Sequence, residues 1–242
     1  RVYLAVSLLT NLGLLGYFKY GSFLLENFLA AARSLGWDLT LAAPSIILPV
    51  GISFYTFQTL SYTLDVYRRK TAPTDSFLDY ALYVTFFPQL VAGPIERASA
   101  LLPQLRGGPA PRPGDLAAGG RLITMGMVMK VLIGDRLAPF VEDAFAAPEE
   151  YGSLFLMRGL VFFALQIYCD FSGYSLIARG TARLFGVELM VNFAQPYLAP
   201  NITEFWRRWH ISLSTWLRDY LYIPLGGNRR GRARTYLNLM LT

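Results

Sequence analysis

Cysteine and histidine are almost absent from this sequence of 242 residues, which contains one of each, Cys169 and His210. A single cysteine excludes an internal disulfide, and one cysteine with one histidine excludes the clusters that hold zinc. We therefore expect no metal site and interpret Cys169, in an apolar run, as a small buried hydrophobic residue. The sequence also lacks a nucleophile elbow, a phosphate-binding loop and a dinucleotide fingerprint, so none of these common sites is indicated.

Charge is also scarce. Charged residues make up 16% of the sequence and hydrophobic residues 54%, whereas soluble domains carry about 25% charged residues. No charge occurs between Asp38 and Asp65 or from Val2 to Phe18. A membrane-spanning helix needs about 20 predominantly apolar residues, so both stretches qualify on length. The composition predicts a polytopic membrane protein.

We expect five membrane-inserted helices, which differ in quality. The fourth contains Arg121 and Lys130, which favours an interfacial or bundle-facing position, and the third is short and ends in a Phe-Pro-Gln sequence, which favours a re-entrant or tilted helix. The first lacks a convincing signal-peptide cleavage site. The expected helices are Val2–Tyr20, Ser45–Val66, Tyr80–Val91, Leu116–Leu132 and Ser153–Ile177.

The positive charge is concentrated in residues 204–234, where seven arginines stand against Glu204 and Asp219. Basic clusters can bind nucleic acid, but apolar sequence lies on both sides of this one. The positive-inside rule and attraction to anionic lipid explain it better. We expect this segment to face the cytoplasm and expect no nucleic-acid partner.

The only histidine lies in the most distinctive part of this basic segment. Asn201 with Glu204 three residues later predicts a capping box, and the Pro-Leu-Gly-Gly sequence from Pro224 predicts the end of the helix. The spacing between them predicts one amphipathic helix with His210 at the border of an aromatic stripe. The stripe comprises Trp206, Trp209, Leu213, Trp216 and Tyr220, and the opposite side carries Arg207, Ser214 and Arg218.

Two interpretations of this helix stay open on periodicity alone. In the first, favoured by composition, it is an interfacial helix with tryptophans at headgroup depth and arginines reaching outward. In the second, His210 is a general base or hydrogen-bond partner beside a tunnel, and the arginines receive an anionic ligand.

Two other acidic residues are candidates for special roles. Asp170 lies late in an apolar helix, where a carboxylate should face the bundle interior or a water-filled cavity. We favour a structural ion pair over catalysis, with Arg179 or an arginine of the His210 helix as partner. Glu96, followed by Arg97, comes after a proline-broken helix and is expected to anchor its loop or line an entrance.

Five motifs, in order along the chain, together resemble the membrane-bound O-acyltransferase family. The resemblance is to its bacterial branch of alginate O-acetylation proteins and D-alanyl-lipoteichoic-acid transferases. It implies an all-α polytopic membrane bundle with re-entrant and interfacial amphipathic helices, in which residues 1–242 form a single domain. The motifs are Pro49-Val-Gly-Ile-Ser-Phe-Tyr-Thr-Phe-Gln58, Phe87-Pro-Gln-Leu-Val-Ala-Gly-Pro-Ile-Glu-Arg97, Tyr168-Cys-Asp-Phe-Ser-Gly-Tyr174, Phe205-Trp-Arg-Arg-Trp-His-Ile-Ser-Leu-Ser214 and Asp219-Tyr-Leu-Tyr-Ile-Pro-Leu-Gly-Gly-Asn-Arg229.

The resemblance also implies a function at the bacterial inner membrane. An acyl group, expected to be acetyl, passes from a cytoplasmic activated donor such as acetyl-CoA to a hydroxyl. That hydroxyl belongs to an exported polysaccharide or to a secreted or periplasmic relay partner. The donor is a substrate, and no bound cofactor is implied. The implied site has His210 as a supporting catalytic residue and Trp206, Arg207, Arg208, Trp209, Asp170 and Arg218 as substrate-binding residues.

One departure from the family pattern qualifies this expectation. The family carries two characteristic histidines, and His210 matches the first, in the Arg-Arg-Trp-His motif. The second, usually regarded as catalytic, lies in a following apolar helix, and this sequence stops at Thr242 before such a motif. Because the sequence also begins with Arg1, we expect a fragment truncated at both ends and inactive alone.

Two other functions remain as alternatives. In a transporter or channel without acyl transfer, Asp170 and the arginines would line a conduction path. A non-catalytic membrane scaffold would tolerate substitution of His210 and Arg208 as long as the aromatic stripe remained.

Overall fold

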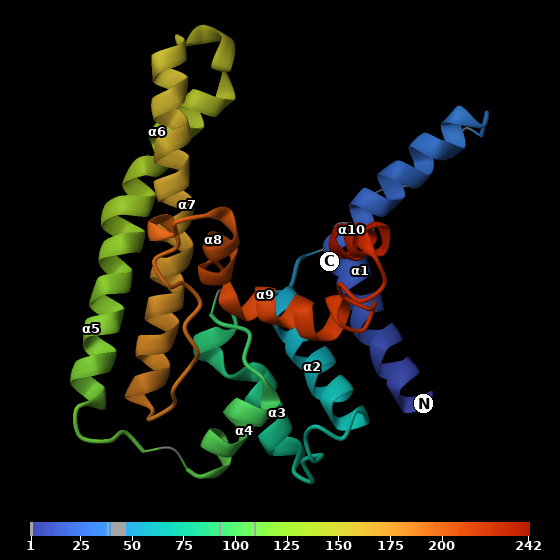
Figure 1. Cartoon of the computed structure of the whole chain (residues 1–242), viewed down its shortest axis with the longest axis vertical. Coiled ribbons are helices and arrows are strands. Elements are labelled where there is room, and N and C mark those ends of the chain that lie inside the picture. The colour runs from blue at the N-terminus through green and yellow to red at the C-terminus, as the bar shows by residue number, and fades with distance from the viewer. Residues whose placement is uncertain (1, 38, 40–46, 92, 109) are drawn as a thin grey trace.

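The computed structural model describes the chain apart from residues 1, 38, 40–46, 92 and 109. Within the described residues all regular structure is helical (Figure 1). The helices are α1 (Val2–Ser34), α2 (Ile52–Tyr67), α3 (Phe77–Thr85), α4 (Ala98–Arg106), α5 (Asp115–Met127), α6 (Asp135–Ala146), α7 (Ser153–Leu184), α8 (Ile202–Arg208), α9 (Ile211–Leu217) and α10 (Arg232–Met240), with π-helical turns at Val128–Gly134 and Arg218–Tyr222.

Three helical stretches are long and apolar enough to cross a bilayer. They are α1, the continuous stretch Asp115–Ala146 that joins α5 to α6, and α7, with 33, 32 and 32 residues. At about 1.5 Å per residue, 32 residues reach about 48 Å, more than the hydrocarbon core requires. The predicted helices at these three places are therefore confirmed, and each extends beyond its predicted end. The chain is an all-α membrane protein.

The other two expected helices are shorter than predicted. Residues 45 and 46 of the second expected helix lie outside the described residues, and α2 begins only at Ile52 and has 16 residues. Gly51 precedes it with φ +76°, and a Cβ there would lie 2.3 Å from the Leu90 carbonyl oxygen. The third, predicted over Tyr80–Val91, ends as α3 at Thr85 because Pro88 follows in a short 3₁₀ turn. Neither forms a full span.

Glycines allow α5 and α7 to pack closely. A Cβ on Gly119 would lie 2.8 Å from the Gly180 carbonyl oxygen, and a Cβ on Gly126 would lie 2.6 Å from that of Gly173. The two pairs are seven residues apart on both helices, and the helices run in opposite directions (Figure 1). Small residues in register bring two membrane helices together because their backbones can approach. The paired helices α5 and α7 support the site described below.

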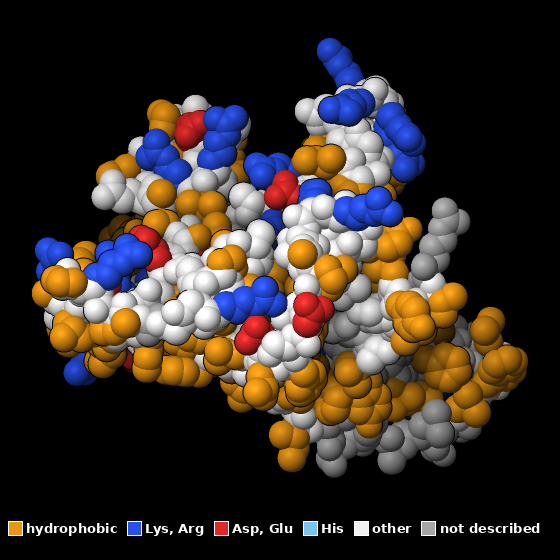
Figure 2. All heavy atoms as spheres, turned by 90° about the horizontal axis from the view of Figure 1, so that it is seen from below, with side chains coloured by type: hydrophobic (Ala, Val, Ile, Leu, Met, Phe, Trp, Pro, Cys, Tyr) orange, Lys and Arg blue, Asp and Glu red, His pale blue; other side chains and the backbone are white. Residues whose placement is uncertain are grey.

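A second core lies where α3 and α4 meet the end of α7. Tyr83, Leu101, Ala182 and Val187 are almost fully buried within it. By contrast, the spanning helices expose many large apolar side chains. In Figure 2 hydrophobic side chains dominate the lower edge of the molecule, and lysines and arginines are concentrated in the upper half. Such exposure is expected of surfaces that face lipid.

Candidate functional site

The segment around His210 is two helices rather than the single predicted one. α8 ends at Arg208, and α9 begins at Ile211. Between them Trp209 is extended and His210 has φ +45°, in the left-handed region that non-glycine residues rarely occupy. The prediction of one continuous helix is therefore wrong at this point, while its capped start is confirmed, since the Asn201 side chain accepts the amide N–H of Glu204 at 2.9 Å.

The break is caused by a distant piece of chain, segment 187–195, which follows α7. The amide N–H of Ala194 donates to the Arg208 carbonyl at 3.0 Å, and the amide N–H of Ile211 donates to the Asn192 carbonyl at 2.9 Å. These bonds replace the helical bonds that the junction would otherwise make. The backbone groups at the two helix ends are thereby satisfied, which a break within the protein requires.

The Asn192 side chain organises the junction. Its Oδ1 accepts the Ser212 amide N–H at 3.2 Å, lies 3.0 Å from Ser212 Oγ and lies 3.1 Å from His210 Nδ1. Its Nδ2 donates to Ser175 Oγ of α7 at 3.3 Å. Asn192 is 1% exposed. Sequence reasoning missed this residue, because an asparagine in an irregular segment has no periodic signal.

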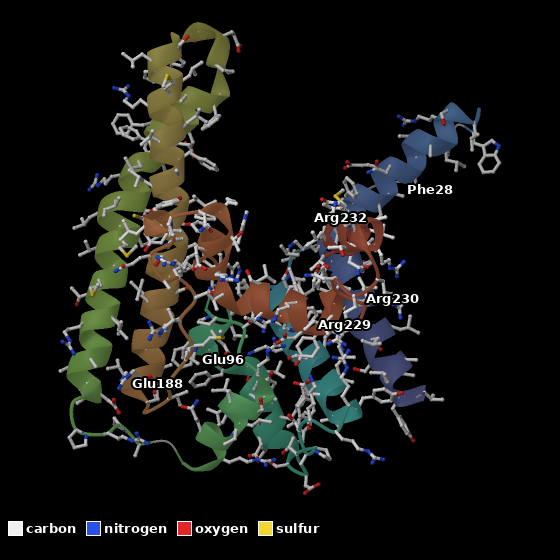
Figure 3. The ribbon with its side chains drawn as sticks, viewed as in Figure 1. Phe28, Glu96, Glu188, Arg229, Arg230 and Arg232 are labelled. Atoms are coloured by element: carbon white, nitrogen blue, oxygen red, sulfur yellow. The ribbon has the colours of Figure 1, made fainter. Side chains whose placement is uncertain are left out.

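Segment 187–195 is itself fixed to the neighbouring elements. The amide N–H of Met190 donates to Oε1 of Glu96 at 2.5 Å, and Arg179 of α7 donates to the Leu189 carbonyl at 3.3 Å. Glu188 exchanges two hydrogen bonds with Gln104 of α4. The expectation that Glu96 anchors a loop is confirmed. Figure 3 labels Glu96, which precedes α4, and Glu188, which lies in the segment itself.

The His210 imidazole is surrounded largely by aromatic rings. Phe171 of α7 meets it edge to face at 4.6 Å between ring centroids, and Phe193 stacks on it at 6.3 Å. Burial lowers the pKa of His210 from 6.5 to about 4, because the charged imidazolium would lose its hydration. The ring is therefore neutral near pH 7. Within the described part of the chain, Nε2 makes no hydrogen bond, whereas Nδ1 bonds to Asn192.

Three adjoining cavities lie along α8, α9 and the π-helical turn. The first, of about 610 Å³, includes His210, and the second, of about 420 Å³, shares Trp206 and Ser214 with it. The third, of about 520 Å³, shares Arg218 with the second. The first is lined by Trp206, Trp209, His210, Leu213, Ser214, Leu217, Leu239 and Thr242, the second by Trp206, Arg207, Ile211, Ser214, Thr215 and Arg218, and the third by Arg218, Tyr222, Ile223, Pro224, Gly226, Gly227, Asn228, Arg229 and Arg230.

Four of the predicted substrate-binding residues lie along these cavities. Trp206 is exposed, and Trp209 packs against Phe193 at 5.1 Å between ring centroids. Arg207 pairs with Glu204 at 2.6 Å, and Arg218 pairs with Asp219 at 2.8 Å. The two arginines and Ser214 share one cavity, as their predicted common side indicated. Arg208 is not among the residues that line these three cavities; its carbonyl holds segment 187–195, and its side chain lies 3.9 Å from Glu204.

The predicted aromatic stripe is split by the break. Trp216 is buried, donates from Nε1 to the Phe57 carbonyl of α2 at 3.0 Å and meets the Phe57 ring edge to face. Tyr220 donates to Asp65 of α2 at 2.5 Å. The two rings therefore pack inside the protein, and the single continuous stripe is wrong. Trp206, Trp209 and Leu213 remain in the cavity that includes His210.

Asp170 is not part of the cavity lining. Its carboxylate pairs with Lys130 of the π-helical turn at 2.6 Å, and Lys130 also pairs with Asp135 at 2.5 Å. The expected ion pair is confirmed, but the predicted arginine partners are wrong, because the close glycine packing brings Lys130 opposite Asp170. The adjacent residue, Phe171, is the one that contacts His210.

Two arginines with no ion-pair partner among the described residues line the third cavity, and a third such arginine follows them in the chain. Arg229 and Arg230 extend from the loop after the π-helical turn, and Arg232 opens α10 (Figure 3). Within the described chain, the ion pairs involve none of these three. The site therefore combines a half-buried neutral imidazole at one end with uncompensated positive charge at the other.

Comparison with known proteins agrees with this arrangement. The sequence profile of MBOAT, the membrane-bound O-acyltransferase family, matches residues 71–242. The chain is 44% identical over 99% of its length to "Probable alginate O-acetylase AlgI" of Pseudomonas syringae pv. tomato and 38% identical over 100% to "Peptidoglycan O-acetyltransferase" of Helicobacter pylori. It is 29% identical over 72% to "Teichoic acid D-alanyltransferase" of Bacillus subtilis.

The matched regions cover 46%, 50% and 45% of those three proteins, so the chain spans about half the length of the curated relatives it matches. The family match nevertheless extends over more than half of this chain and includes the whole segment from the glutamate that anchors segment 187–195 to His210 and the arginine loop. The chain belongs to the membrane-bound O-acyltransferase family.

Proposed function

We propose that the protein transfers an acyl group, expected to be acetyl, from a cytoplasmic activated donor such as acetyl-CoA to a hydroxyl of an exported polysaccharide. Transfer is direct or passes through a secreted or periplasmic relay partner, and the protein resides in the bacterial inner membrane. The names of the relatives support a polymer acceptor, because they refer to alginate, peptidoglycan and teichoic acid.

The observation that carries this proposal is the neutral imidazole of His210 on an otherwise largely apolar cavity. A hydroxyl is a weak nucleophile until a positioned group accepts its proton. In the proposed reaction the hydroxyl oxygen attacks the thioester carbonyl, the carbon–sulfur bond breaks, and the thiolate leaves. His210 supports this step by accepting the hydroxyl proton or a hydrogen bond from it.

The adjoining cavities support a donor with a negatively charged end. Arg207 and Arg218 line the middle cavity, and Arg229 and Arg230 line the far one. About eight residues of helix separate His210 from Arg218, which corresponds to about 12 Å at 1.5 Å per residue. An extended thioester could hold its anionic end at the arginines while its acyl carbon lies near the histidine.

Substitution of His210 tests the proposal. In the protein expressed from its complete gene, His210→Gln should lower polymer-linked acetate about 100-fold, the low end of what acid–base groups contribute. Thr203→Ala, an exposed change on α8, is the control and should leave acetylation unchanged. Full acetylation by the His210→Gln variant would contradict the proposal, and ligand flux in proteoliposomes without acyl transfer would favour a transporter instead.

A further inference from the structure

The orientation of the Asn192 amide is fixed by an unambiguous donor. A backbone N–H can only donate, and the amide N–H of Ser212 is 3.2 Å from the side-chain atom assigned as Oδ1. That atom must therefore be the oxygen, because the alternative orientation would set an NH₂ group against an N–H. The Nδ2 group is then directed at Ser175 Oγ of α7, which can accept its hydrogen bond.

This orientation determines where the proton of His210 lies. Nδ1 is 3.1 Å from an oxygen that has only lone pairs to offer, so the bond exists only if Nδ1 carries the hydrogen. A neutral imidazole has one ring hydrogen, and Nε2 must then be unprotonated. In water the free side chain prefers the opposite tautomer, so the preference has to come from the protein.

We propose that Asn192 is a positioning residue that fixes His210 in the Nδ1-protonated tautomer and thereby keeps on Nε2 the lone pair that the acyl acceptor requires. For its catalytic consequence this inference rests on the proposed function. For the tautomer itself it rests only on the contacts among Asn192, Ser212 and His210.

The burial of these groups explains why one asparagine can have this effect. Asn192 is 1% exposed, so water does not compete for its oxygen. The junction also has a rare backbone conformation, with His210 at φ +45°, and the Ile211–Asn192 backbone bond holds it in register. The ring therefore has little freedom to turn Nε2 toward Asn192 instead.

The charged side chains around the junction are not the source of the preference. The elements packed against His210 carry several charged side chains, among them Asp170 on α7, Glu204, Arg207 and Arg208 on α8, and Arg218 in the π-helical turn. Within the described residues none of these is hydrogen-bonded to the His210 ring; Asp170 pairs with Lys130, Glu204 with Arg207, and Arg218 with Asp219. A neutral amide is therefore the group that selects the tautomer.

Nitrogen-15 NMR of the complete protein, labelled at histidine in liposomes, tests the inference directly, with His210→Gln used to assign the signal. Protonated and unprotonated ring nitrogens have well-separated shifts. In the wild type we expect Nδ1 to be protonated and Nε2 to be unprotonated near pH 7. The control variant Ser212→Ala should give the same result, because it removes the Ser212 hydroxyl that bonds to Asn192 but leaves the contact between Asn192 and His210. A wild-type ring protonated at Nε2 would overturn the inference.

Substitution of Asn192 supplies the second test. Asn192→Ala should shift His210 toward the Nε2-protonated form and lower acyl transfer about 10- to 100-fold, by analogy with groups that orient metal-bound imidazoles. An unchanged tautomer in this variant would overturn the role of Asn192. Asn192→Asp keeps an acceptor oxygen, so it should keep the tautomer, raise the pKa of His210 and move the acidic limb of the rate profile to higher pH.

The Asp variant and the wild-type spectrum decide the question if Asn192→Ala fails to fold. An Asp variant with Nε2 protonated would also overturn the inference. Failure of the tautomer inference is distinguishable from failure of the proposed function. If His210→Gln acetylates normally while the wild-type ring is protonated at Nδ1, the function is wrong and the tautomer assignment stands.

Discussion

At the scale of single residues, the environment of His210 determines its charge. The ring is enclosed by Phe171 and Phe193, and burial lowers the pKa to about 4. The unprotonated ring is thus almost fully populated above pH 5.5, whereas a solvated histidine would be half protonated near pH 6.5. An imidazole in this state can accept a proton throughout the physiological range.

This environment predicts the pH dependence of activity. The acyl-transfer rate should stay flat from about pH 8 to 5.5 and fall only toward pH 4. Because the folded pKa lies below the unfolded one, the contribution of His210 to stability, taken as the difference in melting temperature from His210→Gln, should also fall as pH drops from about 6.5 through 4, where the unfolded state binds the proton more readily. Rate and melting temperature measured between pH 4 and 8 check both, and a rate limb near pH 6.5 that is absent in His210→Gln would contradict them.

The contribution of Glu96 to stability should change with pH in the opposite direction to that of His210. Glu96 is 4% exposed, and burial raises its pKa from 4.5 to about 7, against the smaller effect of the Met190 N–H bond. Its contribution to stability is therefore complete below pH 4.5 and is lost as pH rises through 7. The whole change is about 3 kcal/mol at most.

A Glu96→Gln variant isolates this effect. The amide keeps an oxygen for the Met190 N–H but does not titrate, so the melting temperature of the variant should exceed that of the wild type by a margin that grows as pH rises from 4.5 to 7.5, while the titration of His210 affects both proteins equally. The two proteins should agree near pH 4.5. Parallel curves for both would show that Glu96 is ionised in the fold or that its titration is not coupled to stability.

The sequence indicates these residues unequally. His210 and the arginines can be found because their types are rare here and their spacing is regular. Asn192 cannot, because its importance comes from three bonds to residues 18 and 20 positions away, and no local pattern records such contacts. Lys130 was missed as the partner of Asp170 for the same reason: their pairing depends on how α5 and α7 cross.

At the scale of elements, local signals predicted the two ends of the His210 segment well and its interruption poorly. The cap at Asn201 and the stop after Tyr222 follow from side chains and glycines within a few residues. The break at His210 does not, since the apolar spacing continues through it. Backbone bonds from segment 187–195 outweigh the periodic pattern there, which is a tertiary effect that no window of sequence contains.

The packing of α5 on α7 gives a matched pair of variants. Gly119→Ala would place a Cβ 2.8 Å from the Gly180 carbonyl, so the helices must separate, at a cost of about 1–3 kcal/mol. Gly120→Ala meets no atom within 4 Å and should be neutral or stabilising by up to about 1 kcal/mol, because alanine favours the helix. Unfolding in detergent measures both, and equal stability of the two variants would contradict the close contact.

At the scale of the whole molecule, charge is unequally distributed between the two ends of the pair formed by α5–α6 and α7. The end where α5 begins and α7 ends carries Arg106, Arg112, Arg179 and Arg183, and the opposite end, at the turn before α7, is acidic. Apolar composition alone predicted the membrane and the helical class. The direction of insertion follows only when the helix ends are known, because the positive-inside rule counts charges near them.

The basic end should therefore face the cytoplasm, together with the arginine loop. Single cysteines at exposed positions test this in a Cys169→Ser background: Arg112→Cys and Arg229→Cys on the basic side, and Glu149→Cys in the turn between α6 and α7. In right-side-out vesicles an impermeant maleimide should label only Glu149→Cys, and in inverted vesicles only the other two. Labelling of Arg112→Cys from the outside would show that the protein has the opposite orientation. Labelling of Arg112→Cys and Arg229→Cys from opposite sides would show that the arginine loop does not face the cytoplasmic donor that it is proposed to bind.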